Sequence, residues 1–265
     1  MRRVLAVALA VAAAGCAPAL KEPPPIGSLA KRPATGGASD TAELLRQAAD
    51  AWARRPDLEA VRDAEAIALQ AAQDDGSGID PLIAAARAKA WLAEEESDAK
   101  RRDEAAVSCV QTAQWCAKRE PESAACDYWL AIALGLQARE VPSTAEGGVK
   151  KMVAALERAI ERDPAYDHGG PERVLAIVLV RAPGWPIGPG DPDAALDHAT
   201  KAVGVEPDYP PNVLALAEAQ ARNDRAAARE SYARARTLAD ARRAAGDPDA
   251  SDWVAQADQG LTKLK

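Results

Sequence analysis

The 265-residue chain contains no phenylalanine, and its six tryptophans and four tyrosines make up only 4% of it. β-Strands favour aromatic and β-branched residues, so this scarcity argues against an all-β fold. Alanine, which has the highest helix propensity, occurs 65 times. The composition therefore predicts an all-α protein whose core is made largely of small side chains.

An excess of positive charge is also missing. Lysine and arginine together number 33 against 40 aspartates and glutamates, which gives a net charge of -7 and an isoelectric point near 5.1. Proteins that bind nucleic acids need a basic surface that neutralises phosphates. We therefore exclude nucleic acid as a partner.

No motif of a known catalytic class is present. The sequence has no G-x-S-x-G, H-E-x-x-H, phosphate-binding loop or EF-hand loop, and no C-x-x-C or paired histidines that would hold zinc. His168 beside Asp167 could be imagined as a general base. We favour structural roles instead, with His168 forming hydrogen bonds at a helix entry and His198 exposed on a helix. The prediction is a non-enzymatic protein with no catalytic residues, cofactor or metal.

The N-terminus has the pattern of a secretory signal. Arg2 and Arg3 precede eleven uncharged residues, 4–14, which as a helix would measure about 16 Å, roughly half of the hydrocarbon core of a bilayer. A permanent membrane-spanning helix is therefore not expected. Residues 1–15 are predicted to be a signal peptide.

The end of this segment resembles the lipobox of bacterial lipoproteins, in which small residues precede an invariant cysteine. Ala14, Gly15 and Cys16 match, whereas Ala13 stands where leucine is more usual. The resemblance implies cleavage before Cys16 and lipidation of that cysteine. The alternative is ordinary cleavage of a secretory signal, which the same small residues would accept. Ala17, in place of an aspartate, implies sorting to the outer membrane, with the protein on its periplasmic face.

Residues 16–40 are rich in proline and glycine and have no apolar periodicity. Such a composition is typical of a linker without a fixed conformation. We therefore predict that this segment is a tether between the lipid, as the only membrane anchor, and a folded part formed by residues 41–265.

From Thr41 onward, apolar residues recur at helical spacing, and one pattern returns after 43 residues. It consists of small or apolar residues in a helix followed by a proline that ends the helix, and the fourth copy has lost this proline. Small residues at such positions let two helices cross closely. The copies are Cys109, Ala113, Cys116, Pro121; Met152, Leu156, Ala159, Pro164; Ala195, Ala199, Ala202, Pro207; and, at a shorter interval, Ala228, Tyr232, Ala235, Asp240.

These positions resemble the tetratricopeptide repeat (TPR), a helix pair whose second helix places small residues at the crossing. The resemblance covers residues 41–240 and implies a TPR-like α-solenoid of about five helix pairs. Residues 247–265 are predicted to be a C-terminal capping helix. Asp80, Asp191 and Asp247, each followed by proline, are predicted to cap helix starts. Because each pair buries its apolar face only against its neighbours, we expect one continuous solenoid.

The period exceeds that of the TPR family because residues are inserted between paired helices, around 141–148 and 182–190. The second insertion surrounds Trp185 with glycines and prolines. Loops often carry binding residues, so Trp185 is either an exposed anchor for a partner or a cover for the end of the helical layer. Tyr166, His168 and Tyr209 are the other candidate partner contacts.

Three cysteines follow Cys16. Cys109 and Cys116 lie seven residues apart on one predicted helix, about 10 Å, which is too far for a disulfide. Cys116 and Cys126 flank the turn at Pro121 and are the candidate disulfide in an oxidising periplasm, with Cys109 as a buried thiol. The alternative is that all three are small packing residues.

The stretch 166–220, with DHGGPERVL, APGWP, PGDPDAALDHATKAV and PDYPPNVLALAEA, resembles the T-component lipoproteins that accompany TRAP transporters. That resemblance implies a periplasmic helical protein associated with a solute-binding protein. The chain departs from the pattern in having few bulky residues to line a ligand channel. We therefore predict a lipoprotein adaptor that binds a protein or peptide partner, with a T-component-like role in solute transport as the alternative.

Overall fold

The computed structural model describes residues 18–30 and 40–265. Within these ranges the chain forms helices and turns but no strand, apart from one isolated bridge between Gly184 and Gly190. Three short 3-10 helices are η1 (Ile26–Ser28), η2 (Asp75–Ser77) and η3 (Pro142–Thr144). The α-helices are α1 (Thr41–Trp52), α2 (Leu58–Ala71), α3 (Asp80–Glu95), α4 (Ala99–Arg119), α5 (Ala124–Glu140), α6 (Ala145–Arg162), α7 (Tyr166–Arg181), α8 (Pro192–Val205), α9 (Pro210–Gln220), α10 (Arg225–Ala244) and α11 (Ala250–Lys263).

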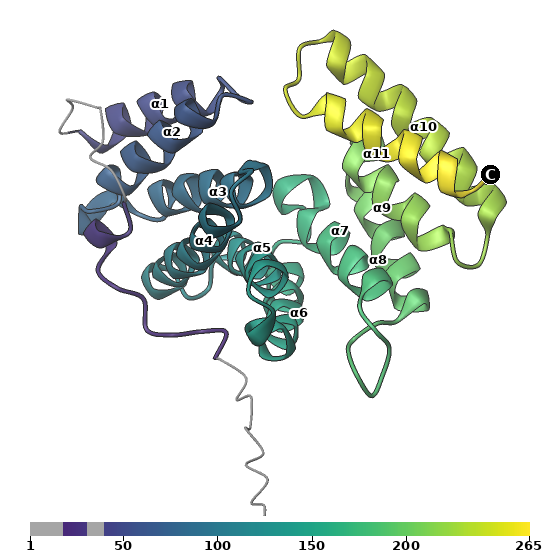
Figure 1. Ribbon diagram of the computed structural model, residues 1–265, viewed down its shortest axis with the longest axis horizontal. Coiled ribbons are helices and arrows are strands. Elements are labelled where there is room, and N and C mark those ends of the chain that lie inside the picture. Colours follow the sequence, from purple (N-terminus) through teal and green to yellow (C-terminus); the bar gives the residue numbers. More distant parts are fainter. Residues whose placement is uncertain (1–17, 31–39) are drawn as a thin grey trace, which may run out of the picture.

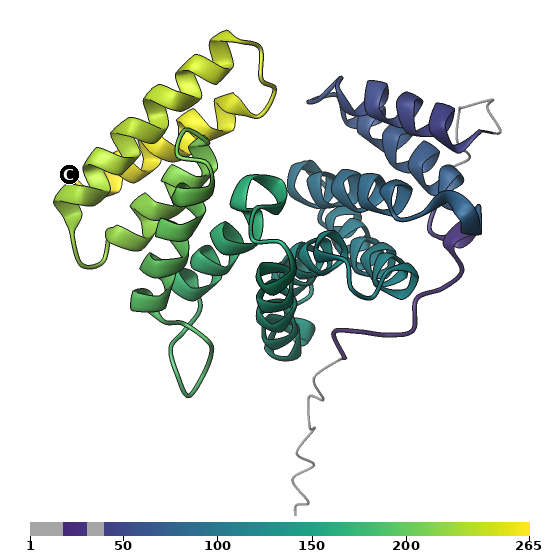
Figure 2. The ribbon, with the colours of Figure 1, turned by 180° about the vertical axis from the view of Figure 1, so that it is seen from behind.

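Each helix packs against the next one along the chain, and α3 also contacts α5 while α7 contacts α9. Figure 1 shows the helices stacked into an arc, with α1 to α3 at one end and α9 to α11 at the other. Figure 2 shows the same arc from behind. The predicted all-α solenoid of helix pairs followed by a terminal helix is confirmed.

The repeated small residues lie where the helices cross. Ala159, Ala199 and Ala202 have no exposed surface, and Cys109 and Ala113 are equally buried in the preceding copy. Alanine at a crossing removes the side-chain volume that would hold the two backbones apart. The 43-residue pattern therefore marks the core of consecutive repeats.

Only one of the three predicted aspartate caps is formed as expected. Asp191 accepts hydrogen bonds from the backbone N–H groups of Asp193 and Ala194 at the start of α8. Asp80 is instead the first residue of α3, because Ile79 before it already has a helical backbone. Asp247 accepts from the N–H of Asp249 and forms a turn, so α11 begins at Ala250.

The predicted insertion at 141–148 is mostly helical. η3 occupies its first part, and α6 begins at Ala145. Gly148 is buried inside α6, where a Cβ atom would lie 3.7 Å from the Cβ atoms of Ala138 and Ala19. This glycine therefore belongs to a packing contact and not to a loop.

The expectation of an unstructured tether at 16–40 differs from the structure over residues 18–30, here called the N-terminal strap. The strap lies along α4, where Trp115 Nε1 donates to the carbonyl of Pro24 at 2.8 Å and Gln114 Nε2 donates to that of Lys21 at 2.9 Å. Ala19 and Leu29 are buried. An extended proline-rich backbone keeps its carbonyls free to accept such hydrogen bonds, so docking needs no periodic apolar pattern. The predicted signal peptide, Cys16 and residues 31–39 lie outside the described residues.

None of the helices in residues 18–30 and 40–265 combines the length and the hydropathy that crossing a bilayer requires.

Candidate partner-binding site

A left-handed turn at the start of α7 forms the middle of the site. Asp167, His168 and Gly169 have positive φ angles of 49°, 61° and 80°, and regular helix resumes after them. A Cβ atom on Gly170 would lie 2.9 Å from the ring of Tyr128. The two glycines therefore let the turn approach its neighbours closely, whereas Asp167 and His168 adopt a backbone conformation that is costly for residues with side chains.

A buried hydrogen-bond network holds this turn. Tyr128 donates its hydroxyl to Asp167 Oδ2 at 2.6 Å, and Arg173 Nη2 donates to the same oxygen at 2.8 Å. Arg173 also donates to Asn212 Oδ1, and Asn212 Nδ2 donates to the carbonyl oxygens of His168 and Ala202. These bonds compensate the strain of the left-handed residues.

The two side chains that donate to Asp167 have shifted pKa values. Burial raises the pKa of Tyr128, so the hydroxyl stays protonated and donates. Burial opposes the charge of Arg173, but Tyr128 and Asp167 raise the pKa of its guanidinium. Asp167 therefore accepts hydrogen bonds from both Tyr128 and Arg173, and its ion pair with Arg173 supports the turn.

Three of the four predicted partner contacts gather around this turn. The ring of His168 stacks on that of Tyr209 with centroids 4.4 Å apart, and Tyr209 meets Trp253 edge to face at 5.7 Å. Tyr166 is half-buried and accepts a hydrogen bond from Trp129 Nε1. These aromatic rings come from α5, α7, α11 and the residue preceding α9.

The opposite end of the arc contributes a second set that sequence reasoning missed. Trp52 in α1 has the guanidinium of Arg55 3.8 Å and that of Arg87 4.7 Å from its ring centroid. Burial, followed by the charge of Arg55, lowers the pKa of Arg87. Its Nε is buried without a hydrogen-bond partner. A buried donor that lacks an acceptor is costly unless a ligand supplies one.

Arg87 connects the two sets electrostatically. The charges of Tyr166, Asp167 and Asp249 raise the pKa of its guanidinium, against the effects of burial and Arg55. Asp249 precedes Trp253 at the start of α11 and accepts hydrogen bonds from Arg55. The two ends of the arc thus meet at this point (Figure 1). We call the combined surface the inner-face cluster; it consists of Trp52, Arg87, Tyr166, His168, Tyr209 and Trp253.

Sequence reasoning had no signal for the Trp52 and Arg87 part of the cluster. It depends on contacts between chain ends that no local pattern encodes. The DHGG sequence at 167–170 did carry a signal, because paired glycines after a polar pair indicate a turn.

The fourth predicted contact, Trp185, lies elsewhere. It is 90% exposed in the loop between α7 and α8, so it does not cover the end of a helical layer. His168 forms a 2.5 Å contact with Glu206. His198, expected to be exposed, has only 21% of its side chain in contact with solvent and lies 2.5 Å from the buried Glu172.

The structure joins Cys116, near the end of α4, to Cys126, in the first turn of α5, by a disulfide with Cα atoms 5.3 Å apart. Cys109 is a free, buried thiol, and burial raises its pKa to about 12. A buried thiol with so high a pKa is chemically inert at neutral pH.

Two cavities of about 340 Å³ each lie away from the inner-face cluster. One, between α2, α3 and α4, is lined by Lys89, whose ammonium binds Glu65, Ser108 Oγ and the carbonyl of Leu29. The other lies between α9, α10 and α11 and contains Tyr232. Neither is lined by Asp167 or His168, so neither supports the acid–base alternative. No group of three metal-ligating side chains occurs among the residues that the structure describes.

Comparisons with known proteins bear on the fold. No family model and no curated protein matches the chain. Among solved structures, a thermophilic TPR protein from Thermus thermophilus is similar, with a TM-score of 0.62 and 18% identity over 84% of this chain and 100% of that one. At this identity the similarity shows the fold alone, and it confirms the predicted TPR-like α-solenoid.

Proposed function

We propose that the protein is a non-enzymatic, lipid-anchored adaptor on the periplasmic face of the outer membrane, which binds a segment of a partner protein on the inner-face cluster. The observation that carries the proposal is the buried, unpartnered Nε of Arg87 beside Trp52. TPR-like solenoids commonly present their concave side to partners. The lipobox and Cys16 support the location.

The chemistry of the cluster suggests what the partner segment carries. Burial and, after it, the charge of Arg55 on the same indole ring lower the pKa of Arg87. An anion bound at the Arg87 guanidinium would favour its charged form. The half-buried rings of Tyr166, Tyr209 and Trp253 offer apolar contact area with few rotatable bonds. The partner segment is therefore one with a carboxylate next to apolar side chains.

Site-specific photocrosslinking in the native periplasm tests this proposal. A photoreactive phenylalanine analogue in place of Tyr166 should capture one discrete partner, and Arg87→Ala in the same chain should remove at least nine-tenths of the adduct. Arg46→Ala is the matched control, because Arg46 is exposed in the same helix as Trp52 and pairs with Glu43 of that helix. Equal adduct in both variants would contradict the proposed site.

The anchor is tested separately. The mature chain should carry a lipid on Cys16 by mass spectrometry, and Cys16→Ser should move the protein from the membrane fraction to the soluble periplasm. A mature chain that begins at another residue, without lipid, would refute the anchor and leave the partner site standing.

The alternative is a T-component-like accessory protein of a TRAP-type transporter. The supporting observation is that Tyr166, His168 and Tyr209, all within the resembling stretch 166–220, lie together in the inner-face cluster. On this alternative, the crosslinked partner is a periplasmic solute-binding protein, and a transporter of this type is encoded beside the gene. A partner of any other kind favours the general adaptor.

A further inference from the structure

The loop between α7 and α8, residues 182–191, projects as a tight and specifically built element. Its base is closed by the hydrogen bond from Gly190 N–H to the carbonyl of Pro183 and by that from Asp191 N–H to the carbonyl of Leu179. A Cβ atom on Gly190 would lie 2.2 Å from the carbonyl oxygen of Ala182, so only glycine fits there. The N–H groups of Ile187 and Gly188 both donate to the carbonyl of Gly184 within the loop.

The tip of this loop presents two large apolar side chains to solvent. Trp185 is 90% and Ile187 is 78% exposed, in a molecule whose other exposed large apolar residue is Val205 at 39% among those described. The hydrogen bonds within the loop hold it in the conformation that exposes both side chains. Exposed apolar groups of this kind mark a contact with another surface.

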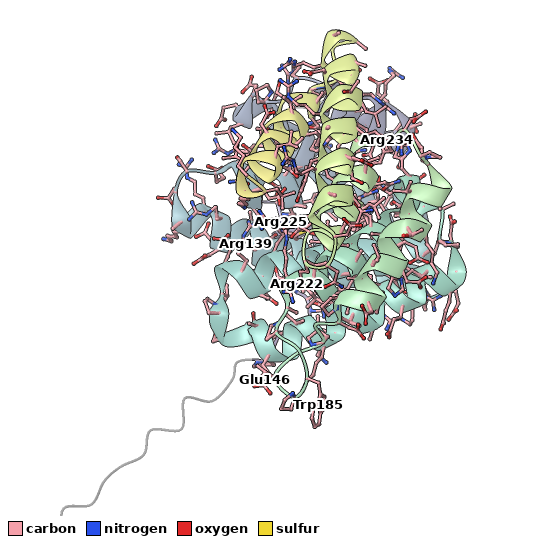
Figure 3. All side chains as sticks on the ribbon, turned by 90° about the vertical axis from the view of Figure 1, so that its right-hand side faces the viewer. Arg139, Glu146, Trp185, Arg222, Arg225 and Arg234 are labelled. Atoms are coloured by element: carbon pink, nitrogen blue, oxygen red, sulfur yellow. A yellow bond between two sulfur atoms is a disulfide. The ribbon has the colours of Figure 1, made fainter. Side chains whose placement is uncertain are left out.

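The position of the loop in the molecule indicates which surface Trp185 and Ile187 contact. Figures 1 to 3 are related by rotation about one vertical axis, and in each the loop is at the lower end of the molecule, where the strap also begins. Figure 3 shows Trp185 and Glu146 pointing out at this end. A Cβ atom on Gly148, two residues after Glu146, would lie 3.7 Å from the Cβ atom of Ala19 in the strap. Pro18 follows the proposed lipid attachment site by two residues.

We propose that Trp185 and Ile187 insert into the interfacial region of the bilayer that holds Cys16, and so form a second membrane contact beside the lipid. The proposal rests on the lipid anchor of the proposed function. Because the strap is docked on α4, the anchor leaves little free chain between the lipid and the folded body. Tryptophan favours the membrane interface over both water and the hydrocarbon core.

Two apolar side chains alone would not hold a protein on a membrane. Next to a lipid anchor they need only partition locally, at a high effective concentration. Their effect is to fix the orientation of the protein, because the loop and the lipid on Cys16 give two separated membrane contacts. The α10–α11 turn lies at the opposite end of the molecule (Figure 1) and would face away from the membrane.

An environment-sensitive fluorophore on the loop tests the proposal. The lipidated mature protein, with Ile187→Cys labelled by a nitrobenzoxadiazole, is reconstituted into vesicles of phosphatidylethanolamine and phosphatidylglycerol. Cys109 is buried and stays unlabelled. We expect a several-fold rise in emission on reconstitution and quenching by lipids that carry a nitroxide near the headgroup. Ala245→Cys, exposed in the α10–α11 turn, is the matched control and should show neither effect.

A second measurement uses the label at Ala245 with an acceptor dye in the lipid headgroups. Replacing Trp185 and Ile187 by serine should broaden the distribution of distances between residue 245 and the membrane, while the protein stays bound through its lipid. A lipidated protein whose label at residue 187 stays in water would overturn this proposal alone. A chain that carries no lipid on Cys16 would overturn both the anchor and the second contact.

Discussion

Arg55 in the α1–α2 turn donates two hydrogen bonds, of 3.2 and 3.0 Å, to the carboxylate of Asp249, a residue 194 positions later at the start of α11. An open solenoid has contacts only between neighbouring repeats. This pair instead joins the first repeat to the last helix. The guanidinium of Arg55 is nearly buried, whereas 42% of the Asp249 side chain is exposed.

Asp249→Ala should loosen the closure without unfolding the protein. Since the carboxylate is partly exposed, we expect a loss of about 1 kcal/mol or less in the free energy of unfolding. Spin labels on the exposed Ala49 in α1 and Gln256 in α11 should show a broader distance distribution by pulsed electron resonance. Asp240→Ala, which breaks ion pairs inside α10 only, is the control. Identical distance distributions in both variants would show that the Arg55–Asp249 pair does not hold the two ends of the arc together.

Asn212→Ala should destabilise the fold through the left-handed turn. The fully buried amide donates to the carbonyls of His168, Ala202 and Glu206 and accepts from Arg173. Leaving several buried polar groups unpaired should cost about 2 to 4 kcal/mol in urea unfolding. The exposed Asn223→Ala should change stability by less than about 0.5 kcal/mol. Equal losses of stability in the two variants would show that Asn212 does not stabilise the left-handed turn.

Ala159→Trp should overpack the crossing of α6 with its neighbours. Ala159 has no exposed surface, so the added ring should lower the free energy of unfolding by about 1 to 3 kcal/mol or more. Ala233→Trp, on the exposed side of α10, provides the comparison for helix propensity alone. An unchanged melting temperature for Ala159→Trp would show that the residue is not at a crossing.

Stability should fall at alkaline pH partly because of Cys109. Burial raises the pKa of this thiol from 9.0 to about 12, so above pH 9 the unfolded chain loses a proton that the folded chain retains. The contribution of Cys109 to the free energy of unfolding is therefore fully present below pH 9 and is lost as the pH rises toward 12. Between pH 8 and pH 10.5, Cys109→Ala should lose less unfolding free energy than the natural sequence, by about 1 to 2 kcal/mol. Parallel losses in the two proteins would show that the thiol ionises freely in the fold.

The helical fold could be predicted because it is encoded locally. Ala159 and Ala202 are small at helix crossings in successive repeats, and a fixed spacing is visible in the sequence itself. The strap could not be predicted this way, because Trp115 holds it through a backbone carbonyl that any residue possesses. Compositions like that of residues 18–30 are shared by linkers and by docked extended segments.

The candidate site likewise contains residues that a local sequence pattern indicates and residues that it does not. Tyr166, His168 and Tyr209 lie near a turn whose glycines are visible in the sequence, and the structure brings them together. Trp52 and Arg87 join them only because the arc curves back on itself. That curvature is the sum of small rotations between helices, which no single residue reveals.

The strap also sets an order for assembly. The strap is synthesised first, whereas Trp115, which donates a hydrogen bond to the carbonyl of Pro24, lies 91 residues farther along the chain. Until α4 and α6 have formed, the strap has no surface to dock on. The strap can therefore dock only after the middle repeats have folded. Variants that fold these repeats slowly should leave the strap exposed to proteases during biogenesis.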